Sequence, residues 1–296
     1  MLTTTTYDSA TDAANSCLLN REVVDVIQDK SFSRTEVVNC PLCTRWHPAT
    51  LVPARFDMKA VIAACKECRI AYQALRPSPD ATLAYMNWRW ASADTYVADT
   101  GAQTARALRQ LRIVETHVTL PLSILDFGAG SGAFVRVALD AGYKATGIER
   151  SDTARAKARQ RFDVELQNEC PDDDAYRVVT LWDVIEHLRD PEESLKMLRS
   201  RMQAGGMIFL ETGNWESWTR LREKNKWRLI LFDHQFYFTP RSLERVLSNV
   251  GFTDFRVLDK NRSHPRLSPH DWAYWLAAKA RWTYSDMTVM TASAKA

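Results

Sequence analysis

A glycine-rich turn between a short apolar segment and a predicted helix carries the clearest chemical signal in this chain of 296 residues. Gly128, Gly130 and Gly132 occupy alternate positions directly after the apolar segment 124–127. Glycine allows a positive φ and lets a ligand approach the backbone closely. The unpaired amides at the start of the following helix then point toward that ligand. The turn therefore predicts a cradle for a nucleotide-like cofactor at the carboxyl end of a strand.

An acidic residue at the end of the next strand strengthens this prediction. Glu149 follows the predicted strand 145–148, and a carboxylate about 20 residues after a glycine turn is suited to bind two ribose hydroxyls. The glycines do not match a dinucleotide fingerprint, and the lysine of a phosphate loop is missing. Tight turns without a ligand also use glycine, so the interpretation depends on Glu149 as well. Asp126, two residues before Gly128, is included in the expected cofactor site.

Four cysteines form two C-x2-C pairs, Cys40 with Cys43 and Cys65 with Cys68, separated by 21 residues. This spacing is typical of a zinc ribbon, in which four thiolates bind one tetrahedral ion. Two disulfides or four buried thiols are the alternatives. The first residues lack the apolar core of a signal peptide, and a reducing compartment disfavours disulfides, so we expect a structural zinc. His47 follows the first pair, but its spacing favours an ordinary loop residue.

Strand and helix patterns alternate after the glycine turn. The β-branched and apolar residues 177–182 predict a buried strand. A helix is predicted over 191–202, because Pro191 and the acidic residues after it suit the positive end of a helix. The next strand is expected at 207–211. Strands and helices that alternate with short links predict a parallel sheet with right-handed crossovers.

Four segments together resemble the class I S-adenosylmethionine-dependent methyltransferases. Residues 125–132, 147–149, 183–191 and 205–212 read LDFGAGSG, GIE, DVIEHLRDP and GGMIFLET. The resemblance implies an α/β fold: a Rossmann-like methyltransferase sheet with helices on both faces, here with a small N-terminal zinc ribbon. It also implies S-adenosylmethionine as the cofactor. The residues to which the family's cofactor and transfer-site roles carry over are Gly128, Gly130, Gly132, Glu149, Trp182 and Asp183.

Methyl transfer to a hydroxyl or an amine often needs a general base, and histidine suits this task near neutral pH. His234 is the candidate base. It begins the run HQFYFTP at 234–240, which resembles a segment of small-molecule methyltransferases in which the histidine lies near the acceptor. A hydrogen-bonded structural histidine is the alternative interpretation. Tyr237 in the same run is a second catalytic candidate.

A further element at the end of the strand 177–182 leaves two interpretations open. Asp183, Glu186 and His187 resemble the Glu-x-x-Glu-His element of quinone-precursor O-methyltransferases, where that element can hold a divalent cation. Many family members carry Glu-His without a metal, and the pair then holds the junction between strand and helix.

The function class follows from these resemblances and from the charge balance. Residues 65–85 loosely resemble the zinc module of methyltransferases from natural-product and glycan pathways, although Arg69 replaces the usual glycine. We expect methyl transfer to a small, aromatic or anionic molecule in a cytoplasmic biosynthetic pathway. An RNA base methyltransferase that uses the zinc module to bind RNA is the alternative. A net charge of +3, from 39 basic and 36 acidic residues, argues against nucleic acid. No apolar stretch approaches the ~20 residues of a membrane span.

The expected organisation has five parts. They are a polar N-terminal extension (1–36), the zinc-ribbon module (37–78), a helical linker or lid (79–118), the S-adenosylmethionine-binding methyltransferase domain (119–260) with a substrate insertion (213–240), and a C-terminal extension (261–296). In the insertion, Trp215, Trp218 and Trp227 either contact a planar substrate or pack in the core. The basic residues within 220–228 either form a solvated helix face or attract an anionic substrate.

Overall fold

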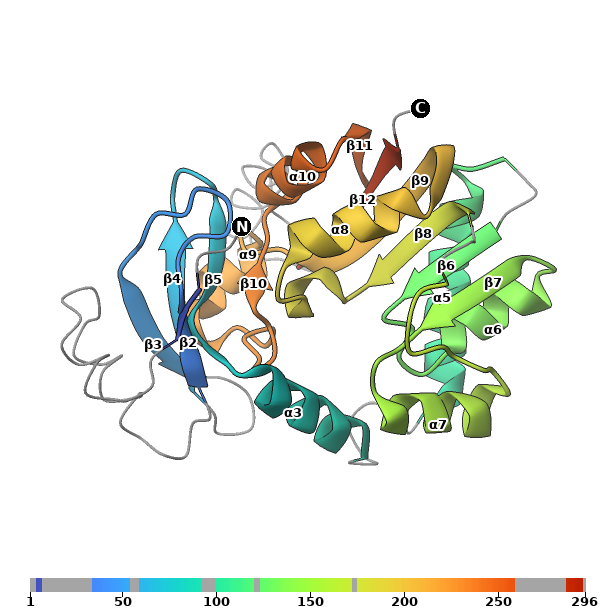
Figure 1. The fold of residues 1–296 in the computed structure, drawn as a ribbon, viewed down its shortest axis with the longest axis horizontal. Coiled ribbons are helices and arrows are strands. Elements are labelled where there is room, and N and C mark those ends of the chain that lie inside the picture. Colours follow the sequence, from blue (N-terminus) through green and yellow to red (C-terminus); the bar gives the residue numbers. More distant parts are fainter. Residues whose placement is uncertain are drawn as a thin grey trace, which may run out of the picture.

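The structure is a computed structural model that describes residues 4–6, 34–53, 59–91, 99–119, 123–171, 175–258 and 286–294. Most of the predicted extension 1–36 and all of the segment 259–285 lie outside the described residues. The described residues form two β-sheets that lie side by side, with helix α3 (Pro79–Ala91) running from the first sheet toward the second (Figure 1).

The first sheet is antiparallel, and the cysteine pairs lie in its loops. Its strands follow the order β1 (Thr4–Thr6), β2 (Arg34–Val38), β5 (Ile70–Pro77), β4 (Lys59–Cys65) and β3 (Ala49–Pro53). A short strand from much later in the chain, β10 (Phe236–Tyr237), pairs antiparallel with β5. The pair Cys65 and Cys68 forms the turn between β4 and β5.

The second sheet carries the glycine turn. Its order is β11 (Phe252–Leu258), β12 (Met287–Ala294), β9 (Met202–Gly213), β8 (Tyr176–Trp182), β6 (Ser123–Phe127) and β7 (Lys144–Ile148). The strands β7, β6, β8 and β9 are parallel, whereas β12 and β11 are antiparallel to their neighbours. The parallel part confirms the predicted Rossmann-like α/β fold.

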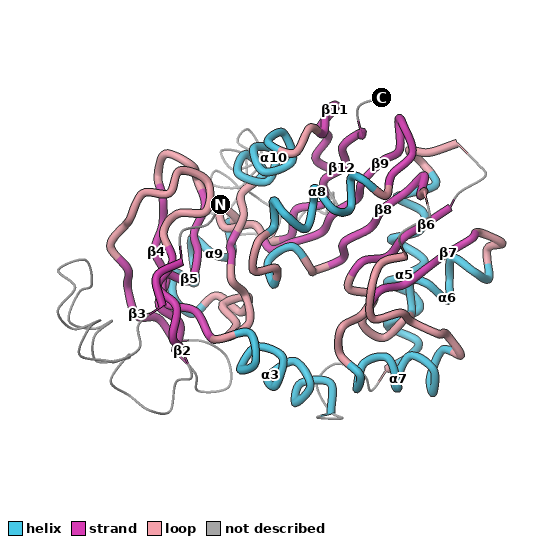
Figure 2. Tube along the Cα trace, in the orientation of Figure 1, coloured by secondary structure: helices cyan, strands magenta, loops and turns pink. Residues whose placement is uncertain are grey.

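Helices cover both faces of the second sheet because adjacent strand residues point to opposite sides. Ile124, Val178 and Phe209 belong to a core with α5 (Thr100–Glu115), α6 (Ala133–Asp140) and α7 (Asp152–Phe162). Leu125, Val179 and Leu210 belong to the core on the opposite face, with α8 (Pro191–Ser200) and α10 (Pro240–Asn249). The two helical layers flank the magenta strands in Figure 2.

Two elements differ from the sequence-based expectation. The segment 261–296 was expected to form an extension, but β12 lies within the second sheet and pairs with both β9 and β11. Its alternation of small, hydroxyl and methionine residues gives no long apolar run that would have revealed it. The helix predicted over 191–202 ends at Ser200, because Met202 already pairs with Tyr176 of β8.

A buried ion cluster joins the first sheet to the loop before α8. The Glu36 carboxylate accepts hydrogen bonds from Arg76 Nε at 3.0 Å and from Arg189. Arg76 also donates to the Arg189 carbonyl at 2.9 Å, and Arg189 donates to the Pro77 carbonyl at 3.0 Å. These contacts fix the end of β5, and therefore the start of α3, against the second sheet.

Among the described residues, none of the helices has both the length and the apolar character needed to cross a bilayer.

Candidate active site

A cavity of about 740 Å³ opens where β6, β7 and β8 end. Ligands of open α/β sheets bind at this edge, beyond the carboxyl ends of the strands. The helices α3 and α5 and the segment 228–234 form the remaining walls. The predicted cofactor residues that line the cavity are Asp126, Gly128, Gly130, Glu149, Trp182 and Asp183. Gly132 is not among the lining residues, and instead caps the start of α6.

The glycine turn needs glycine at two positions that face the cavity. Gly128 and Gly130 have φ values of 75° and 56°, in the left-handed region that other residues adopt with strain. A Cβ atom on Gly128 would lie 2.6 Å from Val184, and one on Gly130 would lie 3.1 Å from the Trp90 ring. The turn therefore exposes backbone, without side chains, to the cavity.

Glu149 ties this turn to the end of β7. Its Oε2 accepts a hydrogen bond from the Gly130 amide at 3.0 Å, and its Oε1 accepts one from the Ser151 amide at 2.8 Å. The Ser151 hydroxyl in turn donates to Asn87 of α3 at 2.7 Å. Burial raises the pKa of Glu149, although both amides favour its ionised form. Glu149 thus presents a buried carboxyl group at the edge of the cavity.

Asp126 is a second buried carboxyl group in this wall. The Thr180 hydroxyl donates a hydrogen bond to its Oδ1 at 2.7 Å. Burial raises the pKa of Asp126 to about 7, and the nearby Glu149 charge adds to the increase, whereas the Thr180 bond and Arg106 oppose it.

A third acidic group is held by helix α5. Asp183 has a φ of 57°, and its Oδ2 accepts a hydrogen bond from Arg106 at 2.5 Å. The same guanidinium lies 3.3 Å from Glu211, which also accepts a bond from Gln110 at 3.1 Å. Arg106 therefore neutralises two carboxylates at the ends of β8 and β9.

Two histidines meet at the part of the cavity wall to which the segment 228–234 contributes. The rings of His187 and His234 pack edge to face, with their centroids 4.6 Å apart. Nδ1 of His187 lies 3.1 Å from the Asp233 carbonyl oxygen and 3.3 Å from Asp233 Oδ2. Arg89 of α3 donates to that same Oδ2 at 2.6 Å. Both histidines line the cavity.

The two histidines differ in charge at neutral pH. Burial alone would raise the pKa of Asp233, but His187 and Arg89 hold it well below its usual range. Burial alone would lower the pKa of His187, but the Asp233 carboxylate raises it to about 9. Burial and the charge of His187 keep the pKa of His234 well below its usual value. At neutral pH, His187 is therefore charged and His234 is neutral.

Comparison with known proteins places this site in a family. Residues 84–257 match the family model described as a methyltransferase domain, which is more than half of the chain. The chain belongs to this methyltransferase family. A ubiquinone biosynthesis O-methyltransferase of Coxiella burnetii is 28% identical over 117 residues, which are 36% of this chain and 50% of that relative. The mitochondrial ubiquinone biosynthesis O-methyltransferase of Candida albicans is 24% identical over 160 residues, or 48% of this chain and 47% of that relative.

The chain spans about half the length of these curated relatives. A solved structure supports the fold at lower identity. A chain from the complex between the Haloferax volcanii Trm112 methyltransferase activator and a methyltransferase matches with a TM-score of 0.51 and 13% identity. The match covers 71% of this chain and 97% of that one.

The second catalytic candidate, Tyr237, lies outside the cavity. Tyr237 packs against Trp215, with ring centroids 5.2 Å apart, and belongs to a core with Trp227 and residues of β4 and β5. It is not among the residues that line the cavity. Trp215 and Trp227 thus pack against the first sheet, which favours the core interpretation for these two tryptophans. Arg220 lies over the Trp215 ring, 3.6 Å from its centroid.

Metal-ligand atoms gather at two places among the described residues. Glu186, His187 and His234 have such atoms within 4.8 Å of one another, so the structure groups His234, rather than Asp183, with the Glu-His pair. Burial raises the pKa of Glu186 to about 8. This carboxyl group is therefore largely protonated at neutral pH.

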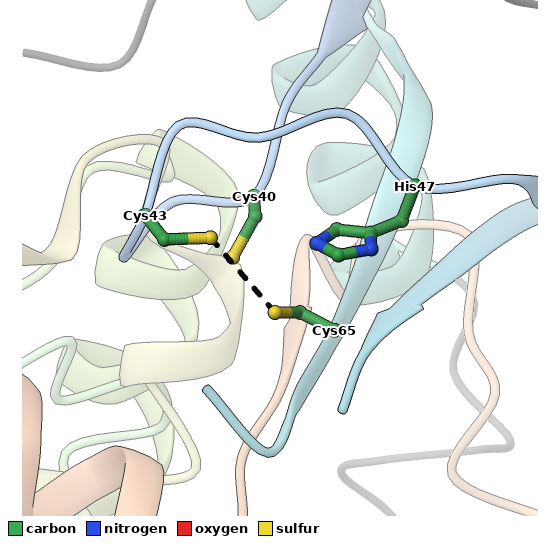
Figure 3. A group of neighbouring side chains, drawn as sticks. All are labelled: Cys40, Cys43, His47 and Cys65. Carbon is green, nitrogen blue, oxygen red and sulfur yellow. Dashed lines mark hydrogen bonds between the residues drawn. The ribbon is translucent and has the colours of Figure 1, made fainter. Parts of the chain in front are cut away.

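The second group lies in the first sheet and contains Cys40, Cys43, His47 and Cys65, again within 4.8 Å (Figure 3). Cys68 is not in this group. Its amide donates to Cys65 Sγ at 3.3 Å, and Arg245 of α10 donates to Cys68 Sγ at 3.3 Å. The donor set of thiols and an imidazole suits zinc.

Several cavity residues were not identified from the sequence. Arg89 and Trp90 lie on α3, and Arg106 and Gln110 lie on α5. The helical pattern of 79–118 predicted a linker or lid, but it did not indicate which helix face meets the strand ends. A charged or aromatic residue on a helix gives no local signal of a partner that lies far away in the sequence.

Asp126→Asn should stabilise the unliganded protein increasingly as the pH rises from about 4 to 7. An unfolded aspartate loses its proton near pH ~3.9, whereas the folded carboxyl holds its proton to about pH 7. Wild-type stability therefore falls between these values and then levels off, and asparagine removes this loss while its carbonyl still accepts the Thr180 bond. Urea unfolding across this range measures the difference. Asp254→Asn, at an exposed site outside the cavity, is the control, and a pH-independent gain from Asp126→Asn would contradict the assignment.

Proposed function

We propose that this chain transfers a methyl group from S-adenosylmethionine to a small-molecule acceptor in a biosynthetic pathway. The observation that carries the proposal is that one cavity is lined both by the glycine turn with Glu149 and by the His187 and His234 pair. The first set suits a nucleoside cofactor, and the second suits a nucleophile that must lose a proton. Membership of the methyltransferase family supports the pairing of these two sets.

The residues of the first set fit the cofactor chemically. The Glu149 carboxylate has further lone pairs that can accept hydrogen bonds from ribose hydroxyls. Gly128 and Gly130 would let the cofactor approach the backbone closely. Asp126 and Asp183 would supply acidic groups near the positive charge of S-adenosylmethionine. Gly132 shapes the turn, and Trp182 contributes an apolar wall. When bound, the cofactor supplies the electrophilic methyl group, and the chain binds it, orients it and excludes water.

His234 is the proposed general base. Its imidazole is neutral at neutral pH, so it can accept a hydrogen bond from an acceptor hydroxyl, whereas the charged His187 cannot. A histidine with a low pKa is a weak base before the reaction. During the reaction the acceptor oxygen forms a bond to the methyl group, and the proton on that oxygen becomes strongly acidic. The neutral His234 ring is then basic enough to accept this proton. His234 is preferred over Tyr237 because it lines the cavity.

The acceptor class follows from the relatives and from the cavity wall. The matched curated relatives are O-methyltransferases of ubiquinone biosynthesis, which supports a small acceptor with a hydroxyl group. Arg228 lines the cavity and could bind an anionic acceptor through its guanidinium group. This group also forms an ion pair with Asp286, with 2.8 Å between the Arg228 nitrogen and Asp286 Oδ2. RNA binding would use aromatic side chains exposed beside basic ones. In the insertion, Trp215 and Trp227 instead pack in a core against the first sheet.

We also propose a structural zinc ion in the first sheet. Cys40, Cys43 and Cys65 contribute three thiolates, and the C-x2-C spacing makes Cys68 the expected fourth ligand. His47 competes for this position because its ring lies within the same group of donor atoms. Four protein ligands leave no open position, so the ion stabilises the turns of the sheet rather than taking part in catalysis.

Glu149→Ala and Glu149→Gln should each weaken S-adenosylmethionine binding by about 1–3 kcal/mol. Alanine removes both carboxylate oxygens, whereas glutamine replaces one of them with an N–H donor that faces the Gly130 or the Ser151 amide. Isothermal titration with the cofactor and with its demethylated product measures the change. Glu165→Gln removes an exposed carboxylate that pairs only with Arg159 in the described structure, and serves as the control. Wild-type affinity in both Glu149 variants would refute the ribose assignment.

His234→Ala should lower turnover about 100-fold or more while leaving cofactor affinity unchanged, because the base acts on the acceptor alone. Formation of S-adenosylhomocysteine with a panel of phenolic and catecholic acceptors gives the rate. His117→Ala is the matched control, since that ring bonds to the Ile113 carbonyl outside the cavity. Turnover that survives in His234→Ala would leave this histidine with a structural role.

Purified protein should contain one zinc ion per chain by elemental analysis, and Cys40→Ser or Cys65→Ser should abolish it and lower the melting temperature. X-ray absorption at the zinc edge identifies the fourth ligand, because a zinc–sulfur distance is about 2.3 Å and a zinc–nitrogen distance about 2.0 Å. Four sulfurs support Cys68, and three sulfurs with one nitrogen support His47. Protein that is stable and free of zinc would refute the site.

A further inference from the structure

A buried glutamine of the first sheet contacts the segment that carries the two candidate-site residues Asp233 and His234. Gln73 lies in the middle of β5, where every residue is buried, and its own side chain is 1% exposed. A carboxamide buried in a strand is destabilising unless its hydrogen bonds are satisfied. The partners of Gln73 therefore indicate what this polar group does in an otherwise largely apolar strand.

The side-chain amide and the backbone amide of Gln73 both donate hydrogen bonds to one short segment more than 150 residues later. Gln73 Nε2 donates to the carbonyls of Phe232 and His234, each at 2.8 Å, and to that of Leu231 at 3.3 Å. The backbone amide of Gln73 also donates to the Gln235 carbonyl, at 2.9 Å. One residue thus holds four carbonyls of the segment 231–235.

This segment has no helix or strand of its own to hold its shape. It is attached to the short helical turn after β8 (Ile185–His187) by the Gln235 amide, which donates to the Glu186 carbonyl at 2.7 Å. It continues into β10, which pairs with β5 at Ala71 and Tyr72. The segment is therefore hydrogen-bonded to the first sheet on one side and to the turn that carries His187 on the other. Its conformation depends on hydrogen bonds from both sides.

The conformation of this backbone sets the geometry of the site. Asp233 reaches Arg89 and His187, while the adjacent His234 ring packs on the His187 ring and lines the cavity. A rotation of the backbone at 233 or 234 would separate these contacts. The carbonyls that Gln73 binds are those on either side of Asp233, together with that of Leu231.

We infer that Gln73 is a positioning residue that holds the backbone of 231–235, so that His234 faces the acceptor and Asp233 faces His187. This role rests on the proposed function of His234. Only a neutral side chain with two N–H donors suits the site. Glutamate would place oxygen lone pairs against the three carbonyls, and leucine cannot donate. Asparagine keeps the donors but is one methylene shorter.

Gln73→Leu and Gln73→Asn test this role against a matched control, Gln235→Leu. Gln235 is equally buried at 1% exposed, its carboxamide has no hydrogen-bond partner among the described residues, and it does not line the cavity. In Gln73→Leu we expect kcat to fall about tenfold or more, with cofactor affinity and the acceptor KM little changed. Gln73→Asn should show an intermediate loss. Gln235→Leu should match the wild type.

A second measurement does not depend on turnover. In protein labelled with ¹³C-histidine, the wild type and Gln235→Leu should show a nuclear Overhauser effect between the rings of His187 and His234, and Gln73→Leu should lose it. If the wild type binds no S-adenosylmethionine, the proposed function fails, while the ring contact still tests Gln73. If Gln73→Leu does not fold, the kcat and the ring contact of Gln73→Asn are the measurements that test the role of Gln73. Wild-type kcat and an intact ring contact in the folded Gln73 variant would overturn the inference.

Discussion

The pairing of β5 with β10 holds the two halves of the molecule together at the site. It joins only two residues of each strand, but it brings a segment of the methyltransferase domain onto the edge of the first sheet. The ion cluster of Glu36, Arg76 and Arg189 supports the same junction from the other end of β5. The segment 228–234, which precedes β10, contributes to the cavity wall. The first sheet thus helps to position one wall of the candidate active site.

The electrostatics of the cavity follow from this arrangement. Carboxyl groups crowd the strand ends, because parallel strands finish at one edge of the sheet, and arginines from α3 and α5 neutralise some of them. Burial keeps Asp126 and Glu186 partly or largely protonated near neutral pH, which limits the repulsion between neighbouring acids. The Asp233 carboxylate raises the pKa of His187 and keeps that ring charged, whereas burial and the charge of His187 lower the pKa of His234 and keep it neutral.

The sequence predicted the parts of the fold whose signals are local. Gly128 and Gly130 have the backbone conformation that their residue type suggested, and the apolar strands and capped helices lie near their expected positions. Strand β12 was missed because its composition is mixed and its partners lie far away in the sequence. The sequence also did not reveal the roles of Arg89, Arg106 and Gln73, because their partners lie far away in the sequence. Their partners are buried carboxylates or backbone carbonyls, which leave no pattern around the donor.

The central claim is that the glycine turn and His234 serve one reaction in one cavity. The most direct test is a nuclear Overhauser measurement on protein saturated with S-adenosylmethionine that carries a ¹³C-labelled S-methyl group. Our account predicts a contact between this methyl group and the His234 ring, assigned by its disappearance in His234→Ala. A bound cofactor whose methyl group contacts other side chains but neither His234 nor His187 would contradict the account.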